Sequence, residues 1–268
     1  MLKAFIALLI FGATQVVATM VALIGLNWEN LINEQPMNKD FLLSHPEASG
    51  ISLLFGAIIA IFLLIATKIA RKSAISSLFQ RPGKTDIYAL IAIPLIAFGM
   101  SFLLSPFDLA DNGTTELFNM MKGNILCILL LCVFGPLFEE FVFRESILRN
   151  LALKSLSPLA AAAVSAILFG AVHGNWAQSI PAIIIGFIFG LFYVRTGNLQ
   201  LSAGAHILNN SMAVLLMFFP QIEESTASLS LFWSILSGIL FCLSGLTFLI
   251  IWWKKSALSR IGQVPPAI

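Results

Sequence analysis

Long apolar segments set the pattern of hydrophobic and polar positions along this chain. About eight of them approach the ~20 residues that a helix needs to cross the hydrocarbon core of a bilayer. They lack the period-two alternation that is typical of a membrane β-barrel, so they predict helices. The expected membrane helices cover residues 4–26, 51–69, 87–104, 123–143, 157–172, 179–194, 202–219 and 229–253.

Two of these segments carry further local information. Ser157 followed by Pro158 is typical of an N-cap and a first helical position, and predicts where the fifth helix begins. The first segment, 4–26, is longer than the apolar region of a signal peptide, so we expect a retained membrane helix. No separate soluble domain fits between the segments, and residues 1–268 are expected to form a single membrane domain.

The composition excludes a soluble globular protein. Hydrophobic residues make up 59% of the chain and charged residues only 10%, against about a quarter in soluble domains. Lipid must therefore surround most of the exterior. Cys127, Cys132 and Cys242 lie within apolar segments at spacings that fit neither a zinc site nor a disulfide framework, so we expect small buried packing residues.

The connections between segments alternate in charge. Residues 27–50 are mostly acidic and 68–86 mostly basic, and the connection after the fourth segment carries Arg144, Arg149 and Lys154 against Glu145. The positive-inside rule then places both termini in the cytoplasm. The sequence predicts an all-α, polytopic membrane helix bundle of about eight transmembrane helices, with the lipid bilayer and not nucleic acid as its surroundings.

Ionisable residues inside membrane segments cost a few kcal/mol each, so every cluster of them calls for an explanation. The first cluster ends the fourth segment, where Glu140 and Arg144 are four residues apart and share a helix face. Glu139 is rotated by about 100° from its neighbour and must face something else. The alternative is an ordinary interfacial helix end with a salt bridge.

Two further clusters lie on other segments. Phe169 and His173 are one turn apart at the end of the fifth segment, and His206 and Asn210 are one turn apart early in the seventh. Taken singly, the first is also compatible with a packed histidine and the second with an interhelical hydrogen-bonding pair. Together with the carboxylates they suggest amide hydrolysis, with Glu as general base and His and Asn as oxyanion donors.

The three clusters occur in an order that resembles the signature of a known family. That family is the CAAX-protease and bacteriocin-processing (CPBP, Abi) family of intramembrane proteases, which includes the type II CAAX prenyl endopeptidases. The resemblance covers roughly residues 125–216, and residues 123–219 are expected to form the catalytic core. The matching positions are Glu139, Glu140, Arg144, Phe169, His173, His206 and Asn210.

The resemblance implies a role for each position. Glu140 would activate water as general base, and Arg144 would orient the carboxylates. His173 would hold the water or assist proton transfer. His206 and Asn210 would form the oxyanion hole.

The resemblance defines the roles of Glu139 and Phe169, the membrane and the substrate less closely. Glu139 would be supporting or partly catalytic, and Phe169 would be a structural wall. The expected enzyme is an intramembrane endopeptidase of the bacterial plasma membrane, acting near the cytoplasmic side on a membrane-associated peptide or protein. Nothing in the sequence selects a prenylated substrate over another.

Other interpretations remain open from the sequence. Glu140, His173 and His206 could ligate zinc, but the chain has no His-Glu-x-x-His helix, and Arg144 would place a positive charge near the metal, so we favour a cofactor-free glutamate mechanism. A transporter would use the same polar residues as an ion path, although no internal repeat supports it. A non-catalytic scaffold or immunity protein is the third alternative.

The expected helix ends leave one geometrical conflict. Glu140 and His206 fall near cytoplasmic ends, whereas His173 follows about 24 Å of the fifth helix at ~1.5 Å rise per residue. Either the fourth helix continues through Arg149, which places Glu140 deeper, or the fifth helix is strongly tilted.

Overall fold

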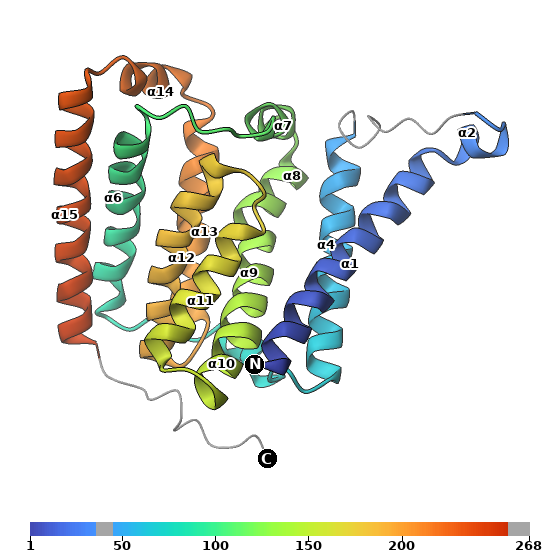
Figure 1. Ribbon diagram of the computed structural model, residues 1–268, viewed down its shortest axis with the longest axis horizontal. Helices are drawn as coiled ribbons and strands as arrows, with labels where there is room; N and C mark the ends of the chain where they lie inside the picture. The colour runs from blue at the N-terminus through green and yellow to red at the C-terminus, as the bar shows by residue number, and fades with distance from the viewer. Residues whose placement is uncertain (36–44, 257–268) are drawn as a thin grey trace.

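The computed structural model describes residues 1–35 and 45–256, and this part of the chain is all-α, as predicted. Each of the eight apolar segments forms a helix or a continuous run of helical turns (Figure 1). They are α1 (Leu2–Leu26), α4 (Pro46–Ala66), α6 (Asp86–Leu104), the run Ile125–Lys154, α11 (Pro158–Ala171), α12 (Trp176–Thr196), α13 (Gln200–Leu216) and α15 (Leu231–Lys255).

Six helices in the described residues are long and apolar enough to cross a membrane, judged by length and composition alone. The other two expected spans are shorter, because α11 has 14 residues and α13 has 17. α11 ends at Ala171, two residues before His173, and α13 carries His206. Ser202, Asn209 and Asn210 lower the hydropathy of α13. The number eight and the side of each terminus therefore remain predictions.

The fourth segment extends well beyond its expected end at residue 143. It runs for 30 residues from Ile125 to Lys154. Its parts are α8 (Ile125–Leu129), the π-helical η1 (Leu130–Phe134), α9 (Gly135–Glu140), the π-helical η2 (Phe141–Leu148) and α10 (Arg149–Lys154). The charges at residues 144–154 thus lie in a helix and not in a connection. Glu140 lies in the middle of this helix, as one of the two solutions to the geometrical conflict requires.

The helices pack in two groups around this long helix. One core joins α1 and α11 to Phe141, Phe143 and Leu148. A second core joins α6, α12, α13 and α15 around Phe189 and Trp252. In Figure 1, α1 and α4 form a pair at one side of the bundle, α15 lies along α6 at the other, and α12 and α13 lie between them.

Short helices and the N-terminus mark the two ends of the bundle. The N-terminus lies at the same end as α10, and α2, α7 and α14 lie at the opposite end (Figure 1). The short helices outside the eight segments are α2 (Trp28–Ile32), α5 (Ser73–Ser77), α7 (Thr114–Met121) and α14 (Pro220–Ala227).

The N-cap prediction is confirmed, and the prediction of buried cysteines is confirmed for two of the three. The Ser157 hydroxyl accepts the Ala160 amide at 3.3 Å, and Pro158 is the first helical residue of α11, as the N-cap pattern indicates. Cys127, Cys132 and Cys242 are free thiols packed within the bundle, and the first two are buried.

Candidate active site

Glu140 and Arg144 pair along one face of the long helix, as their spacing predicts. The Arg144 Nε donates to Glu140 Oε2 at 3.1 Å, and both side chains are fully buried. Arg144 also donates to the Ser165 hydroxyl of α11 at 3.2 Å. A buried ion pair of this kind is costly to break from one side, because the remaining charge has no water to solvate it. The arginine therefore fixes the Glu140 carboxylate.

Aromatic rings complete the surroundings of Arg144. Its guanidinium carbon lies 5.2 Å from the ring centre of Phe169 and 6.0 Å from that of Phe189. Its second terminal nitrogen has no hydrogen-bond acceptor among the described residues, so ring faces take that place. Gly186 of α12 permits this packing, since a Cβ there would lie 2.8 Å from the Phe169 ring.

His206 of α13 bridges the two adjacent carboxylates. Its Nδ1 lies 3.1 Å from Glu140 Oε1, and its Nε2 lies 3.5 Å from Glu139 Oε2. A carboxylate only accepts, so the shorter contact places a proton on Nδ1. The longer contact exceeds an ordinary N–H···O bond, so Nε2 is the less committed of the two nitrogens.

The two carboxylates differ in their access to the cavity. Glu140 is 0% exposed, and its oxygens contact Arg144 and His206. The Glu139 side chain is 31% exposed and lines the cavity. The side of the helix that each residue faces, and not the sequence spacing, makes this difference.

His173 lies on the far side of Phe169 from this cluster. Its Nδ1 donates to the Phe169 carbonyl at 2.8 Å, because that oxygen can only accept, and Nε2 is left with a lone pair. The Phe169 ring meets both imidazoles edge-on, at 4.9 Å for His173 and 5.5 Å for His206. Phe169 lines the cavity and contacts both histidines, and no direct bond between His173 and the carboxylates is found among the described residues.

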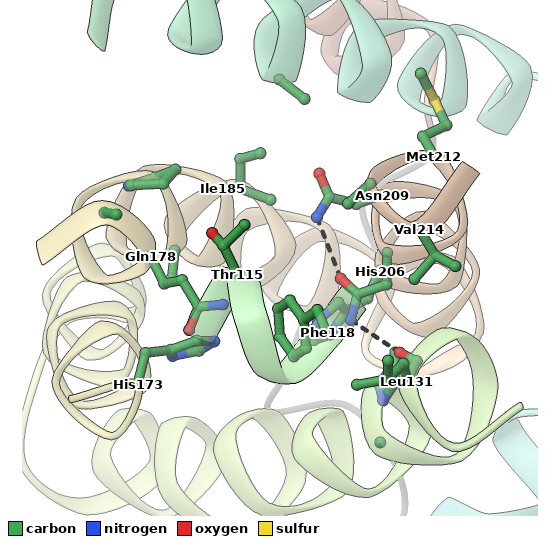
Figure 2. Close-up of a pocket in the computed structure, with 18 of the residues that line it drawn as sticks. Thr115, Phe118, Leu131, His173, Gln178, Ile185, His206, Asn209, Met212 and Val214 are labelled. Carbon is green, nitrogen blue, oxygen red and sulfur yellow. Dashed lines mark hydrogen bonds between the residues drawn. The ribbon is translucent and has the colours of Figure 1, made fainter. Parts of the chain in front are cut away.

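Asn210 lies one turn after His206, and its amide is held at both ends. Its Nδ2 donates to the Leu131 carbonyl at 3.1 Å, and its Oδ1 accepts from Asn209 Nδ2 at 3.2 Å. Figure 2 shows these two bonds as dashed lines that lead from Asn209 and Leu131.

Most of these groups line one cavity of about 1650 Å³, whose wall is mostly apolar. Glu140 and Arg144 do not line it. Figure 2 shows His173 on one side and His206 with Asn209 on the other, and Thr115 and Phe118 of α7 appear between them in this view. The polar members of its wall that concern catalysis are Glu139, His173, His206, Asn209 and Asn210. The bundle of apolar helices therefore contains a cavity that is large enough for a peptide and has polar side chains on part of its wall.

Sequence reasoning missed several residues of this region. Asn209, Gln178 and α7 all line the cavity, and the only sequence signal for Asn209 was its position beside Asn210. Glu145, counted above with a basic connection, is instead fully buried. No local pattern identifies these residues, because their neighbours come from distant parts of the chain.

Glu145 forms a second buried ionic cluster five residues after Glu140. It accepts from Arg71 Nε at 2.9 Å, from the second guanidinium nitrogen at 2.8 Å and from the Arg71 backbone amide at 3.0 Å. The Tyr193 hydroxyl donates to it at 2.6 Å. The bonds to Glu145 raise the pKa of the Arg71 guanidinium above its ordinary value. This cluster ties the connection after α4 to the long helix and to α12.

Comparison with known proteins gives a family match and relatives that include two membrane peptidases. Residues 121–212 match the family described as type II CAAX prenyl endopeptidase Rce1-like. The putative membrane peptidase YdiL of Bacillus subtilis (strain 168) is 21% identical over 206 residues, which cover 74% of this chain and 83% of that protein. The membrane-embedded CAAX protease MroQ of Staphylococcus aureus (strain USA300) is 28% identical over 166 residues, which cover 57% of this chain and 67% of that protein.

The search of solved structures gave no significant match. The family match and the two peptidase relatives indicate a membrane endopeptidase, and the apolar helices indicate an integral membrane protein. The resemblance to the CAAX-protease family is confirmed over residues 121–212, the segment that carries all three motifs.

Proposed function

We propose that this protein is an intramembrane endopeptidase that hydrolyses a peptide bond of a membrane-associated peptide or protein. The observation that carries the proposal is the meeting of Glu139, His173, His206 and Asn210 at the wall of one cavity inside an apolar bundle. Polar groups at this depth are costly, and hydrolysis in lipid requires water held beside a base. The bacterial relatives support a place in the bacterial plasma membrane.

The general base in this proposal is Glu139 and not Glu140, the residue that the sequence favoured. Glu140 has no exposed surface, and Arg144 and His206 engage both of its oxygens. Glu139 is next to it in the chain but faces the cavity. A base must reach the proton that it removes, so the accessible carboxylate suits the role better. Glu140 then serves to hold His206 and Arg144 in place.

The reaction follows from these positions. Glu139 takes a proton from water as the water oxygen bonds to the substrate carbonyl carbon, and the lone pair on His173 Nε2 helps to hold that water. His206 and Asn210 bind the oxyanion of the tetrahedral intermediate. The C–N bond then breaks as Glu139 returns the proton to the leaving amine.

The zinc alternative fits the arrangement poorly. Its ligands would be Glu140, His173 and His206, yet Glu140 is enclosed and paired with Arg144. In the described residues no group of three or more His, Cys, Asp and Glu side chains is arranged to hold a metal ion. We therefore propose a metal-independent mechanism. Purified enzyme should keep its activity in a chelator, and loss of turnover that only added zinc restores would contradict this.

A cleavage assay in proteoliposomes tests the proposed function. The probes are an internally quenched peptide ending in a farnesylated CAAX sequence and the same peptide without the prenyl group. Wild type should cleave at least one of them, and His173→Ala should lower the rate by roughly 10²-fold or more if it holds the attacking water. Equal rates in wild type and His173→Ala would reject the mechanism. The ratio between the two peptides then shows whether a prenyl group is part of the substrate.

A further inference from the structure

A proline in the long helix leaves one backbone carbonyl without its usual partner. In the π-helical segment η1 the Gly135 amide donates to the Leu130 carbonyl. The π-helical donor to the Leu131 carbonyl would be the backbone amide of residue 136, but Pro136 has no N–H. The Leu131 carbonyl accepts instead from Asn210 Nδ2 of α13 at 3.1 Å. The irregular turn thus supplies a fixed acceptor for a side chain on another helix.

The opposite end of the same amide is held by a neighbour on α13. Asn210 Oδ1 accepts from Asn209 Nδ2 at 3.2 Å. A carbonyl can only accept, so Leu131 decides which end of the Asn210 amide carries the NH₂ group. Asn209 fixes the other end and so the plane of the amide. The second N–H of Asn210 has no acceptor among the described residues, and Asn210 lines the cavity.

We propose that Asn209 is a positioning residue, which together with the Leu131 carbonyl holds the Asn210 amide so that its remaining N–H points to the oxyanion. This inference rests on the proposed function, because it assumes that Asn210 is an oxyanion donor. If the amide turned over, its oxygen would face the oxyanion and repel it. A donor contributes fully to the transition state only when it is already oriented there.

The substitutions Asn209→Ala and Asn209→Asp separate positioning from packing. Alanine removes one of the two bonds on the amide, so kcat should fall roughly tenfold with KM unchanged. Aspartate keeps the shape of the side chain but places an acceptor opposite Asn210 Oδ1. This repulsion favours the turned-over amide, in which the Asn210 oxygen would face the Leu131 carbonyl. Its kcat should fall by roughly 10²-fold, approaching the loss of an oxyanion donor in Asn210→Ala. A packing role predicts the reverse order, with alanine the worse substitution.

Asn119→Asp is the matched control, because Asn119 of α7 lines the same cavity and forms no hydrogen bond with Asn210 among the described residues. It measures how much a new carboxylate elsewhere in the cavity lowers kcat. The decrease should be clearly smaller than in Asn209→Asp. Equal decreases of kcat in Asn119→Asp and Asn209→Asp would overturn the proposal. A greater loss of kcat in Asn209→Ala than in Asn209→Asp would overturn it as well.

A measurement without substrate tests the same point independently. The protein is labelled with [¹⁵N]asparagine in detergent micelles, and the Asn210 side-chain resonances are identified by their absence in Asn210→Ala. Asn209→Ala should shift them and let their protons exchange severalfold faster, whereas unchanged resonances would contradict the positioning role. If wild type cleaves neither peptide, the proposed function fails, yet this spectrum still decides whether Asn209 positions Asn210.

Discussion

Two buried glutamates on one helix, Glu140 and Glu145, have similar partners and different surroundings. Both are 0% exposed, and each pairs with an arginine. Glu140 adjoins His206, which also contacts the cavity-lining Glu139. Glu145 is enclosed by Arg71 and Tyr193 and does not line the cavity.

The comparison shows that burial and ion pairing do not by themselves mark a catalytic group. Both clusters are costly in an apolar bundle, and in both the glutamate carboxylate is held by hydrogen bonds from more than one side chain. Only one of them borders a cavity with a carboxylate that water can reach. We therefore expect substitutions in the first cluster to change turnover and substitutions in the second to change stability.

The largest effect should come from Glu139→Gln, compared with Glu140→Gln. Loss of the base should lower kcat by roughly 10³-fold or more, while the melting temperature stays close to that of wild type. Glu140→Gln should also lose activity, and it should unfold at lower temperature because Arg144 is left with an unpaired buried charge. Cleavage rates and thermal unfolding in detergent measure both. Full activity in Glu139→Gln would return the role of base to Glu140.

The next effect concerns the Glu145 cluster. Glu145→Ala leaves Arg71 and Tyr193 without their shared acceptor, and should destabilise the fold by about 3–5 kcal/mol. The molecules that remain folded should retain their activity. Arg71→Ala tests the pair from the other side and should be similarly destabilising. A selective loss of kcat at normal melting temperature in either variant would mean that this cluster takes part in the reaction.

The smallest effect is expected from Tyr193→Phe. The ring stays in the core, and the hydroxyl loses its 2.6 Å bond to Glu145 and the 3.2 Å bond that it accepts from Arg71. Because Glu145 is charged, the cost should be about 1.5–3 kcal/mol, seen as a lower melting temperature with unchanged kcat. A variant as stable as wild type would show that the two arginines beside Glu145, Arg71 and Arg149, satisfy the carboxylate without the hydroxyl.

Local spacing in the sequence was sufficient to predict the helices, one buried ion pair and the family resemblance. Apolar length predicted a helix in each of the eight segments, and the i, i+4 spacing predicted the pairing of Glu140 with Arg144. The motif order predicted the family. These features depend on residues within a few helical turns, so a single sequence is sufficient to find them.

Tertiary structure alone decided which of two adjacent carboxylates reaches the cavity. Glu139 and Glu140 differ by one residue, and their environments are set by α13, whose His206 is 66 residues from Glu140 in the chain. Glu145 is likewise enclosed by Arg71, 74 residues away, and the Asn210 amide is oriented by Leu131, 79 residues away. Helix periodicity gives the angle between neighbouring side chains, but only the packing of distant helices determines what each one faces.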